Sequence, residues 1–324
     1  MSIFEVLKSK LNDAPQKLRI VFPESEDIRV LRAVQRLVAE NLLEPVLLGQ
    51  PKRVKEIARQ AGLNLDKIII VQPDADDRMV AAFGQARGKR ISEEEVRTAL
   101  RDDNYFGTMM VQMGDADGMV SGATRSTAAT VRPALQLIHA AQGMKRISGG
   151  FIMERGEEQY VFADCAINLD PDSQTLAEIA YQSVQTARMI DLEPRVAFLS
   201  FSTKGSAKGE MVDKVVKASE LFKQNHPEII ADGELQFDAA FVPEVAAAKS
   251  SQSPLKGRAN VFIFPELQSG NIAYKITQRL GNFTAIGPIL QGIAQPINDL
   301  SRGASSEDIY DIAILTAAQA LVGR

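Results

Sequence analysis

The amino-acid sequence predicts an α/β protein with mostly parallel sheets that helices cover on both faces. Short apolar runs alternate with amphipathic helical segments along most of the 324 residues, which is the spacing of strand–helix–strand units. Hydrophobic residues make up 45% of the chain and charged residues 24%, an ordinary globular composition. A chain of this length is expected to form about two domains.

The first part of the chain shows this alternation most clearly. Residues 18–22 form an apolar run and predict a strand. Residues 27–41 place Ile28, Leu31 and Val34 on one face and predict a helix. By the same reasoning, further strands are predicted at 45–48, 67–71 and 118–121, and further helices at 52–62, 76–86, 92–101, 104–114 and 127–142.

The pattern changes near residue 145. Residues 147–155 and 159–164 can form an antiparallel pair joined around Gly156. The last predicted helix, 305–322, is apolar almost all round and must therefore be buried. Between them, helices are predicted at 173–190, 209–224, 239–249 and 270–281, strands at 195–201, 234–237 and 260–264, and an irregular stretch after Gly287 and Gly292.

Composition excludes several classes of protein. No apolar run approaches the roughly 18 residues that a membrane span needs, and the first eight residues do not resemble a signal peptide. Net charge is −4 with no basic block, so nucleic acid is not an expected partner. The single cysteine, Cys165, excludes an intrachain disulfide and disfavours a cysteine-rich zinc site. We therefore expect a cytoplasmic protein.

The segment 121–132 (Ser-Gly-Ala-Thr-Arg-Ser-Thr-Ala-Ala-Thr-Val-Arg) joins a predicted strand to a predicted helix. Free backbone N–H groups and the helix dipole at such a junction favour a bound phosphate. Arg125 would lie in the turn, and Arg132 would lie one to two turns into the helix. Ordinary N-capping by Ser126 or Thr127 explains the same residues equally well.

Two further segments carry candidate chemistry. Residues 201–209 contain small residues and two lysines, which suit an anionic ligand, although a solvated loop is the more ordinary interpretation. Ser301 and Arg302 lie in a loop before the last helix, and Asp308 lies in its first turn. Ser305-x-x-Asp308 is typical of a capping box, and spacing alone favours capping over catalysis for Asp308.

Taken together, these segments resemble the phosphate acetyltransferases of the acetyl/butyryl phosphotransferase family. Matching stretches include Pro-Glu-Ser-Glu-Asp-Ile-Arg at 23–29, Asp-Gly-Met-Val-Ser-Gly-Ala at 117–123 and Asn-Asp-Leu-Ser-Arg-Gly at 298–303. The resemblance spans essentially the whole chain. Further matches lie at 199–207, 232–240, 260–265 and 270–276.

The resemblance implies an architecture like that of isocitrate and isopropylmalate dehydrogenases. Two α/β domains would flank a cleft that holds the active site. Residues 1–144 and 297–324 would form a discontinuous first domain that carries Ser301, Arg302 and Asp308, and residues 145–296 would form an inserted second domain. The chain resembles the short form without an N-terminal regulatory domain, and members are usually homodimers.

The reaction implied is acetyl-CoA + phosphate ⇌ acetyl phosphate + CoA, with CoA as a substrate and neither a metal nor another cofactor. Asp308 matches the proposed general base for the CoA thiol, while Ser301 and Arg302 match residues at the reacting group. Arg132 and Arg87 match arginines tied to substrate binding. Ser126, Thr127 and Arg125 are further binding candidates.

The sequence departs from the family pattern at two positions. Arg125 stands where many members carry histidine and would add a positive charge at the phosphate site, and Ala304 stands where many carry cysteine. A preference for a longer acyl group such as butyryl stays open, as does a non-catalytic module that binds acyl-CoA. A dehydrogenase has only the analogy of fold in its favour.

Overall fold

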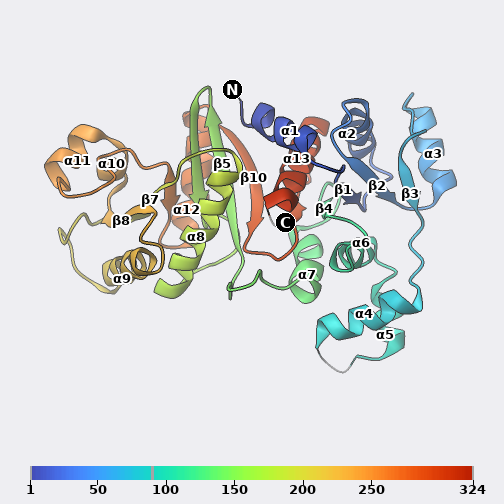
Figure 1. The fold of residues 1–324 in the computed structure, drawn as a ribbon, viewed down its shortest axis with the longest axis horizontal. Coiled ribbons are helices and arrows are strands. Elements are labelled where there is room, and N and C mark those ends of the chain that lie inside the picture. Colours follow the sequence, from blue (N-terminus) through green and yellow to red (C-terminus); the bar gives the residue numbers. More distant parts are fainter. Residues whose placement is uncertain (1, 89–90, 323–324) are drawn as a thin grey trace. The chain divides into compact units, whose positions relative to one another are not determined.

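A computed structural model describes residues 2–88 and 91–322, in which the chain divides into two compact units (Figure 1). The first unit is built from Phe4–Ala141 and from the described residues from Ile293 onward. The second unit contains Gln142–Gly292 and the start of the chain. The candidate residues Ser301, Arg302 and Asp308 therefore belong to the first unit.

The first unit contains a sheet of five strands, all parallel. Gly118 and Met119 are neighbours in one strand and face opposite sides of this sheet. Met119 lies close to helix α6 (Asp103–Gln112), while Gly118 lies against Thr316 of helix α13 (Ser306–Val322). The strand order is β11 (Ile297–Asp299), β4 (Gly118–Ser121), β1 (Arg19–Phe22), β2 (Glu44–Leu48) and β3 (Ile69–Val71).

Helices cover both faces of this sheet, as the alternating pattern predicts. The apolar helix α13 (Ser306–Val322) is buried along most of its length and packs on β4 and on α2 (Ile28–Ala39). On the other face, α6 and α7 bury Met109, Phe106 and Leu137 against Val21 and Met119. The remaining helices are α1 (Ile3–Asp13), α3 (Pro51–Gln60), α4 (Asp77–Arg87), α5 (Glu93–Ala99), α6 (Asp103–Gln112) and α7 (Thr127–Leu137).

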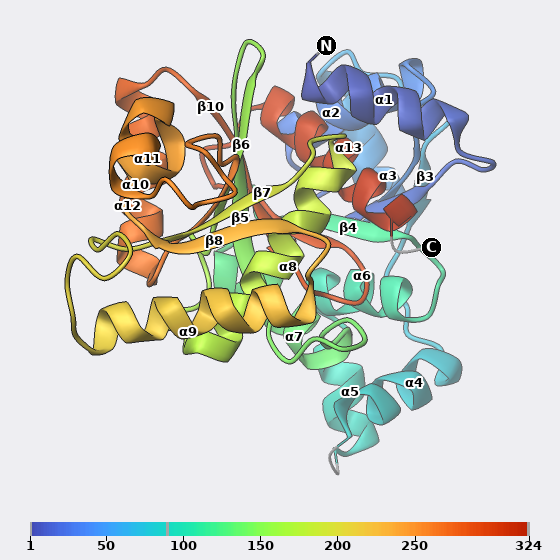
Figure 2. The same ribbon diagram turned by 60° about the vertical axis from the view of Figure 1, so that its left-hand side comes forward.

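The second unit contains a mixed sheet of six strands. Its first three strands are antiparallel and the others are parallel, in the order β10 (Thr284–Gln291), β5 (Ser148–Arg155), β6 (Glu158–Ala163), β9 (Val261–Ile263), β7 (Arg195–Leu199) and β8 (Ile230–Leu235). Figure 2 shows α9 beside α8 and β8, in agreement with their packing. The helices are α8 (Ser173–Met189), α9 (Glu210–Asn225), α10 (Phe237–Phe241), α11 (Pro243–Lys249) and α12 (Leu267–Leu280).

The predicted α/β class is confirmed, and so is the antiparallel pair joined around Gly156. Several predicted bounds are wrong. The helix predicted at 127–142 ends at Leu137, because His139 adopts a left-handed backbone (φ 62) and Ala140 pairs with Ile293. The strand predicted at 234–237 runs from Ile230 to Leu235 instead.

Two further predictions for the second half of the chain are wrong. The helix predicted at 239–249 is two short helices, since Pro243 cannot continue the first one and begins the second. The stretch expected to be irregular after Gly287 contains strand β10 and, further on, strand β11. The sequence also gave no sign of α1. No helix within residues 2–88 or 91–322 has the length and apolarity of a membrane span.

Candidate functional site

Three loops of the first unit begin at the same edge of its sheet. They follow β1, β4 and β11, which are neighbours in the sheet and run parallel. The carboxyl ends of parallel strands are where α/β proteins usually bind ligands. The loops after β4 and β11, together with the helices that follow them, carry most of the residues that the sequence marks as candidates, including Arg125 and Arg302.

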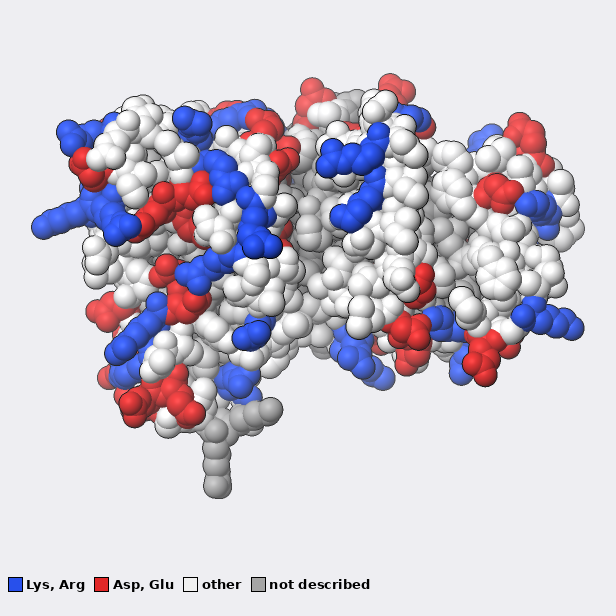
Figure 3. Space-filling view, turned by 180° about the vertical axis from the view of Figure 1, so that it is seen from behind, with Lys and Arg blue, Asp and Glu red and all other residues white. Residues whose placement is uncertain are grey.

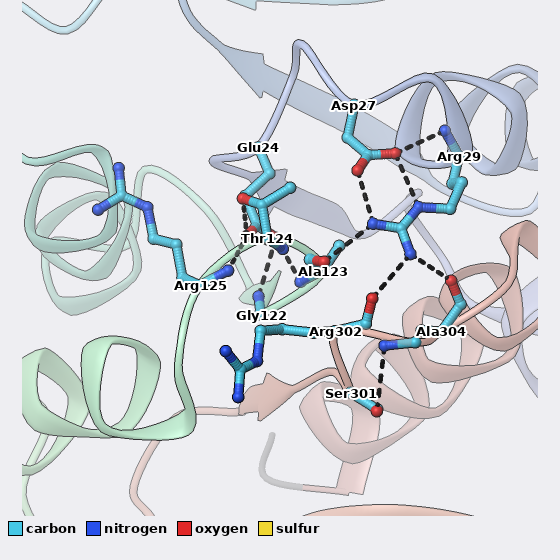
Figure 4. A network of polar contacts seen from close by, with 11 residues as sticks. Glu24, Asp27, Arg29, Gly122, Ala123, Thr124, Arg125, Ser301, Arg302 and Ala304 are labelled. Carbon is cyan, nitrogen blue, oxygen red and sulfur yellow. Dashed lines mark hydrogen bonds and ion pairs between the residues drawn. The ribbon is translucent and has the colours of Figure 1, made fainter.

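The loop after β4 closes around the carboxylate of Glu24, which follows β1 and is only 8% exposed (Figure 4). Oε2 accepts hydrogen bonds from the N–H groups of Gly122 and Ala123, both at 2.8 Å. Oε1 accepts from the N–H of Thr124 (2.7 Å), its hydroxyl (2.7 Å) and the N–H of Arg125 (3.1 Å). A carboxylate of the protein therefore already uses the N–H groups of residues 122–125, so these four groups are not free for a phosphate, as one of the two interpretations of the segment expected.

Helix α7 starts directly after this loop, and the predicted capping by Ser126 is also wrong. Ser126 is the N-cap residue, but its exposed side chain forms no capping hydrogen bond. Thr127, the first helical residue, is exposed as well. Its hydroxyl and that of Thr130 favour the charged form of Asp299, but burial of that carboxyl is the larger effect and raises its pKa. Thus both Ser126 and Thr127 present side chains at an exposed helix start.

Arg29 connects the loops after β4 and β11 through their carbonyl groups. One guanidinium nitrogen, Nη2, donates to the carbonyl of Ala123 at 2.9 Å. The other, Nη1, donates to the carbonyls of Arg302 (3.0 Å) and Ala304 (2.7 Å). Asp27 orients this guanidinium by accepting from Nε and Nη2, and this hydrogen bonding lowers the pKa of Asp27.

Sequence reasoning assigned no role to Glu24, Asp27 or Arg29. The available signal was the stretch 23–29, in which three acidic residues and an arginine directly follow a buried strand. That stretch contributed to the family resemblance, but nothing in it shows what the charged groups contact. Asp27 pairs with Arg29 two positions away, but the partners of Glu24 and Arg29 in the other loops lie about a hundred or more positions away, at Gly122 and beyond.

Ser301 and Arg302 both lie exposed in the loop after β11. The Ser301 hydroxyl accepts a hydrogen bond from the N–H of Gly303 at 3.3 Å. No hydrogen bond or ion pair to a described residue fixes the Arg302 guanidinium, and Figure 4 shows it directed away from Arg29. The backbone of Arg302 is therefore held in place, while its guanidinium group is available to bind an anion.

Asp308 forms the capping box that its spacing predicts. Its Oδ2 accepts from the N–H and the hydroxyl of Ser305, both at 2.8 Å. In return, the Ser305 hydroxyl accepts from the N–H of Asp308 at 3.1 Å. The Asp308 side chain is exposed, and no donor among the described residues reaches its Oδ1. Capping thus occupies one carboxylate oxygen and leaves the other accessible.

The other candidate arginines differ in how firmly they are held. Arg125 forms an ion pair with Asp102, the N-cap residue of α6, at 2.7 Å. Arg132 lies exposed in the second turn of α7 without a described partner for its guanidinium. Arg87 is the last residue of α4. The carbonyl oxygen of Ala86, the residue before it, lies 2.8 Å from Nε2 of His139.

This contact places the backbone of Arg87 near the far end of α7. His139 lies just beyond the C-terminus of α7, whereas Arg125 precedes its N-terminus. The 11 residues of α7 span about 16 Å. The structure therefore brings together the loops that carry Arg125 and Arg302, but it does not bring Arg87 into their hydrogen-bond network.

The second predicted anion loop, at 201–209, also surrounds a carboxylate of the protein. Buried Glu234 accepts from the N–H of Gly205 (2.7 Å) and from the hydroxyl of Ser202 (3.0 Å). Lys204 forms an ion pair with Asp232 at 2.6 Å. This loop is therefore tied down by internal contacts and its Lys204 is already paired.

No group of three or more histidine, cysteine, aspartate or glutamate side chains in the described parts of the chain is arranged to hold a metal ion. The single thiol, Cys165, is buried, and burial raises its pKa well above the usual range. The groups that the loops expose are instead arginines, hydroxyls and the Asp308 carboxylate. This set suits an anionic substrate and a proton transfer.

Comparisons with known proteins give one consistent result. The family model described as "Phosphate acetyl/butaryl transferase" matches residues 2–317. The phosphate acetyltransferase of Bacillus subtilis (strain 168) is 54% identical over 322 residues, covering 98% of this chain and 99% of that protein. A phosphotransacetylase from Streptococcus pyogenes has a TM-score of 0.96 at 54% identity, with 99% of each chain covered. The EutD phosphotransacetylase from Staphylococcus aureus has a TM-score of 0.93 at 48% identity, with 98% of each chain covered.

Proposed function

The chain belongs to the phosphate acetyl/butaryl transferase family and is an acyltransferase of its phosphate acetyltransferase branch, and we propose that Asp308, Ser301 and Arg302 carry its reaction. That reaction is acetyl-CoA + phosphate ⇌ acetyl phosphate + CoA. One observation carries the residue assignment. The exposed Asp308 carboxylate keeps Oδ1 accessible, on the same chain segment as the unpaired guanidinium of Arg302.

Asp308 is proposed as the general base. A thiol with a pKa of about 8.5 is only a few per cent ionised at neutral pH. Oδ1 of Asp308 would accept the proton of the CoA thiol while the sulfur bonds to the acetyl carbonyl carbon. The carbon–oxygen bond to phosphate then breaks, and phosphate leaves. Ser305 supports this role, since its two hydrogen bonds to Oδ2 orient the carboxylate.

Arginines are proposed to bind the phosphoryl group. The guanidinium groups of Arg302 and Arg132 pair with no described residue. They suit this role, because a planar fork can donate two hydrogen bonds to a phosphate. Ser301, Ser126 and Thr127 add exposed hydroxyl donors. Arg125 would contribute mainly charge, since Asp102 already holds it. Arg87 is proposed on the resemblance alone.

We also propose that the protein works as a cytoplasmic homodimer without a metal. Helix α12 exposes Ile272 (54%), Ile276 (52%) and Leu280 (82%), which lie four residues apart on one face and suit contact with a second copy. Basic and acidic side chains intermingle over the face in Figure 3, which gives nucleic acid little to bind. Light scattering of the purified protein tests the dimer.

The domain assignment that the resemblance implies is likewise a proposal. Residues 1–144 with 297–324 would form one domain, and residues 145–296 would form the other. The division of the chain after Ala141 and after Gly292 supports this assignment. A fragment covering 145–296 that folds on its own would support it further.

The activity is tested by mixing the purified protein with acetyl phosphate and CoA and following thioester absorbance. A parallel run uses butyryl phosphate. Faster turnover with acetyl phosphate is expected. Preference for butyryl phosphate would move the substrate assignment to longer acyl groups. No thioester from either substrate, in protein shown to be folded, would refute catalysis and favour a module that only binds acyl-CoA.

A further inference from the structure

The loop at Gly122–Arg125 has the form of an anion-binding site that the protein fills itself. Its four consecutive N–H groups all donate to the carboxylate of Glu24. Consecutive N–H groups that converge on one point are a recurrent way to bind phosphate and other anions. Here Glu24 meets that need from within the chain, and the buried carboxylate in turn receives five donors.

The segment after β1 also binds backbone carbonyl groups of the loops after β4 and β11. Arg29 lies five positions after Glu24 and donates to the carbonyls of Ala123, Arg302 and Ala304. One short stretch after β1 thus supplies both partners that the loops need. The Glu24 carboxylate accepts from their N–H groups, and the Arg29 guanidinium donates to their carbonyl groups. Figure 4 shows both contacts meeting at the loop after β4.

This arrangement fixes the site before any substrate arrives. The loop after β4 leads directly into α7, which carries Ser126, Thr127 and Arg132. The loop after β11 carries Ser301 and Arg302. Because Glu24 already uses the N–H groups of residues 122–125, these four groups are not available to a substrate phosphate. A preformed site also avoids the free-energy cost of ordering the loops during binding.

We propose that Glu24 is a positioning residue of the acetyl transfer site, acting as a built-in anion that holds the loop of Arg125 and the start of α7 in the reactive arrangement. The proposal rests on the proposed function, because it assigns Glu24 to the same site. Glu24 does not contact substrate in this role. Its effect passes through the backbone of residues 122–125.

The decisive variant is Glu24→Ala, because acetate supplies the atoms that this substitution removes from the buried site. We expect kcat/KM per folded molecule to fall by about 100-fold, the usual effect of a misplaced site. Acetate should then restore activity at least about tenfold and raise the melting temperature of the variant. Formate, one carbon smaller, should restore less. Chloride keeps the ionic strength constant throughout.

The matched control is Glu26→Ala. Glu26 lies two positions further along, is exposed, and among the described residues forms an ion pair with Arg53 at 2.7 Å. The wild type and Glu26→Ala should show no gain from acetate in activity or in melting temperature. If the Glu24→Ala variant folds only in acetate, that dependence shows that the added anion occupies the loop, and the positioning role is then decided by the Glu24→Gln variant.

The variant Glu24→Gln keeps the size of the side chain but points an amide N–H₂ group at backbone donors. It should fold and lose kcat/KM. A Glu24→Gln variant with wild-type kcat and KM would overturn the proposal. So would a folded Glu24→Ala variant that ignores acetate, or one whose activity falls only in step with its folded fraction.

The outcome separates this proposal from the activity itself. If the wild type forms no thioester, the proposed function fails. A rise in the melting temperature of Glu24→Ala with acetate would still show that the loop binds an anion where Glu24 normally lies.

Discussion

Replacing Asp308 by Asn separates the two roles that the structure allows this residue. As a cap, Asp308 accepts two hydrogen bonds from Ser305, and an asparagine side-chain oxygen can still accept from the Ser305 N–H. As a base, Asp308 must take a proton, which an amide cannot do. Capping boxes contribute about 0.5–2 kcal/mol to stability. General-base catalysis contributes about 10²–10⁴ in rate, so the two effects differ in kind and in size.

The expected result is a folded Asp308→Asn variant whose kcat falls by at least about 100-fold. Thioester formation from acetyl phosphate and CoA is measured as a function of pH, together with urea unfolding. The loss of kcat relative to the wild type should become smaller as the pH rises above the thiol pKa of about 8.5, because the thiolate then forms without a base. A loss that is the same at every pH would contradict thiol activation as the role of Asp308.

Ser305→Ala is the matched control, because it removes the hydroxyl half of the same capping box. It should lower the free energy of unfolding by about 1 kcal/mol. It should keep kcat within a few-fold, since the backbone N–H of residue 305 still donates to Oδ2 and orients the carboxylate. If Ser305→Ala loses as much kcat as Asp308→Asn, or if Asp308→Asn keeps full kcat, the general-base assignment is refuted and Asp308 is a cap only.

Three further predictions concern Arg132, Asp311 and Glu40. Arg132→Ala should weaken acetyl phosphate binding by about 1.5–3 kcal/mol for a lost charged hydrogen bond, and unchanged KM values for both substrates would contradict this. Burial, with help from Glu307 and Asp308, raises the pKa of Asp311 to about 7, so its charge destabilises the folded state increasingly as pH rises from about 4 through 7. Asp311→Asn should therefore raise the melting temperature at pH 8 and leave it unchanged at pH 4; equal shifts at both pH values would argue against a titrating Asp311. The hydrogen bond from Tyr310 leads the effects that lower the pKa of Glu40 to about 2, so its stabilisation is complete above about pH 4.5 and is lost as pH falls towards 2. Because its side chain is 35% exposed, Glu40→Gln should cost only about 1 kcal/mol in urea unfolding at pH 7, and a cost that persists at pH 2 would refute the ionic explanation.

The local hydrophobic pattern was enough to predict the parallel sheet of the first unit, but it did not predict where every helix and strand ends. The strand Gly118–Ser121 was predicted at its observed bounds, because turn residues flank a short apolar run. The helix beginning at Thr127 was predicted five residues too long. Its end depends on the left-handed backbone of His139 and on the pairing of Ala140 with Ile293. That pairing joins residues more than 150 positions apart, and no local window contains it.

Strand β10 was missed for a related reason. Its residues read as irregular because Gly287 and Pro288 interrupt them, and the ladder with β5 is itself shifted between Ile286 and Ile289. The strand exists because it pairs with β5, about 130 residues earlier in the chain. Pairing between distant segments depends on packing and register, which the hydrophobic period of one segment does not encode.

The same limit applies to the site, where the sequence identified an anion-binding loop but could not identify the anion. Glycine and hydroxyl residues before α7 correctly predicted backbone N–H groups in need of an acceptor. The acceptor is Glu24, about a hundred positions earlier. Asp308 shows the converse case. Its capping box is local and was visible in the sequence, whereas its proposed catalytic role came from the family resemblance and stays a prediction.

Internal carboxylates organise two other loops of this protein in the same way. Asp164, 1% exposed, accepts from the N–H groups of Ala166 (2.8 Å), Ile167 (3.0 Å) and Asn168 (2.9 Å). Glu234, 4% exposed, accepts from the N–H of Gly205 at 2.7 Å. Burying a carboxylate raises the free energy of the folded state unless several donors contact it, and so does leaving the N–H groups of a loop unpaired. In these loops the carboxylate and the N–H groups satisfy each other. A glycine- or serine-rich loop after a strand therefore predicts an anion, but that anion can be part of the chain. When it is, those N–H groups are not available to a substrate phosphate, and we propose that the loop instead contributes to catalysis by holding the residues that follow it in place.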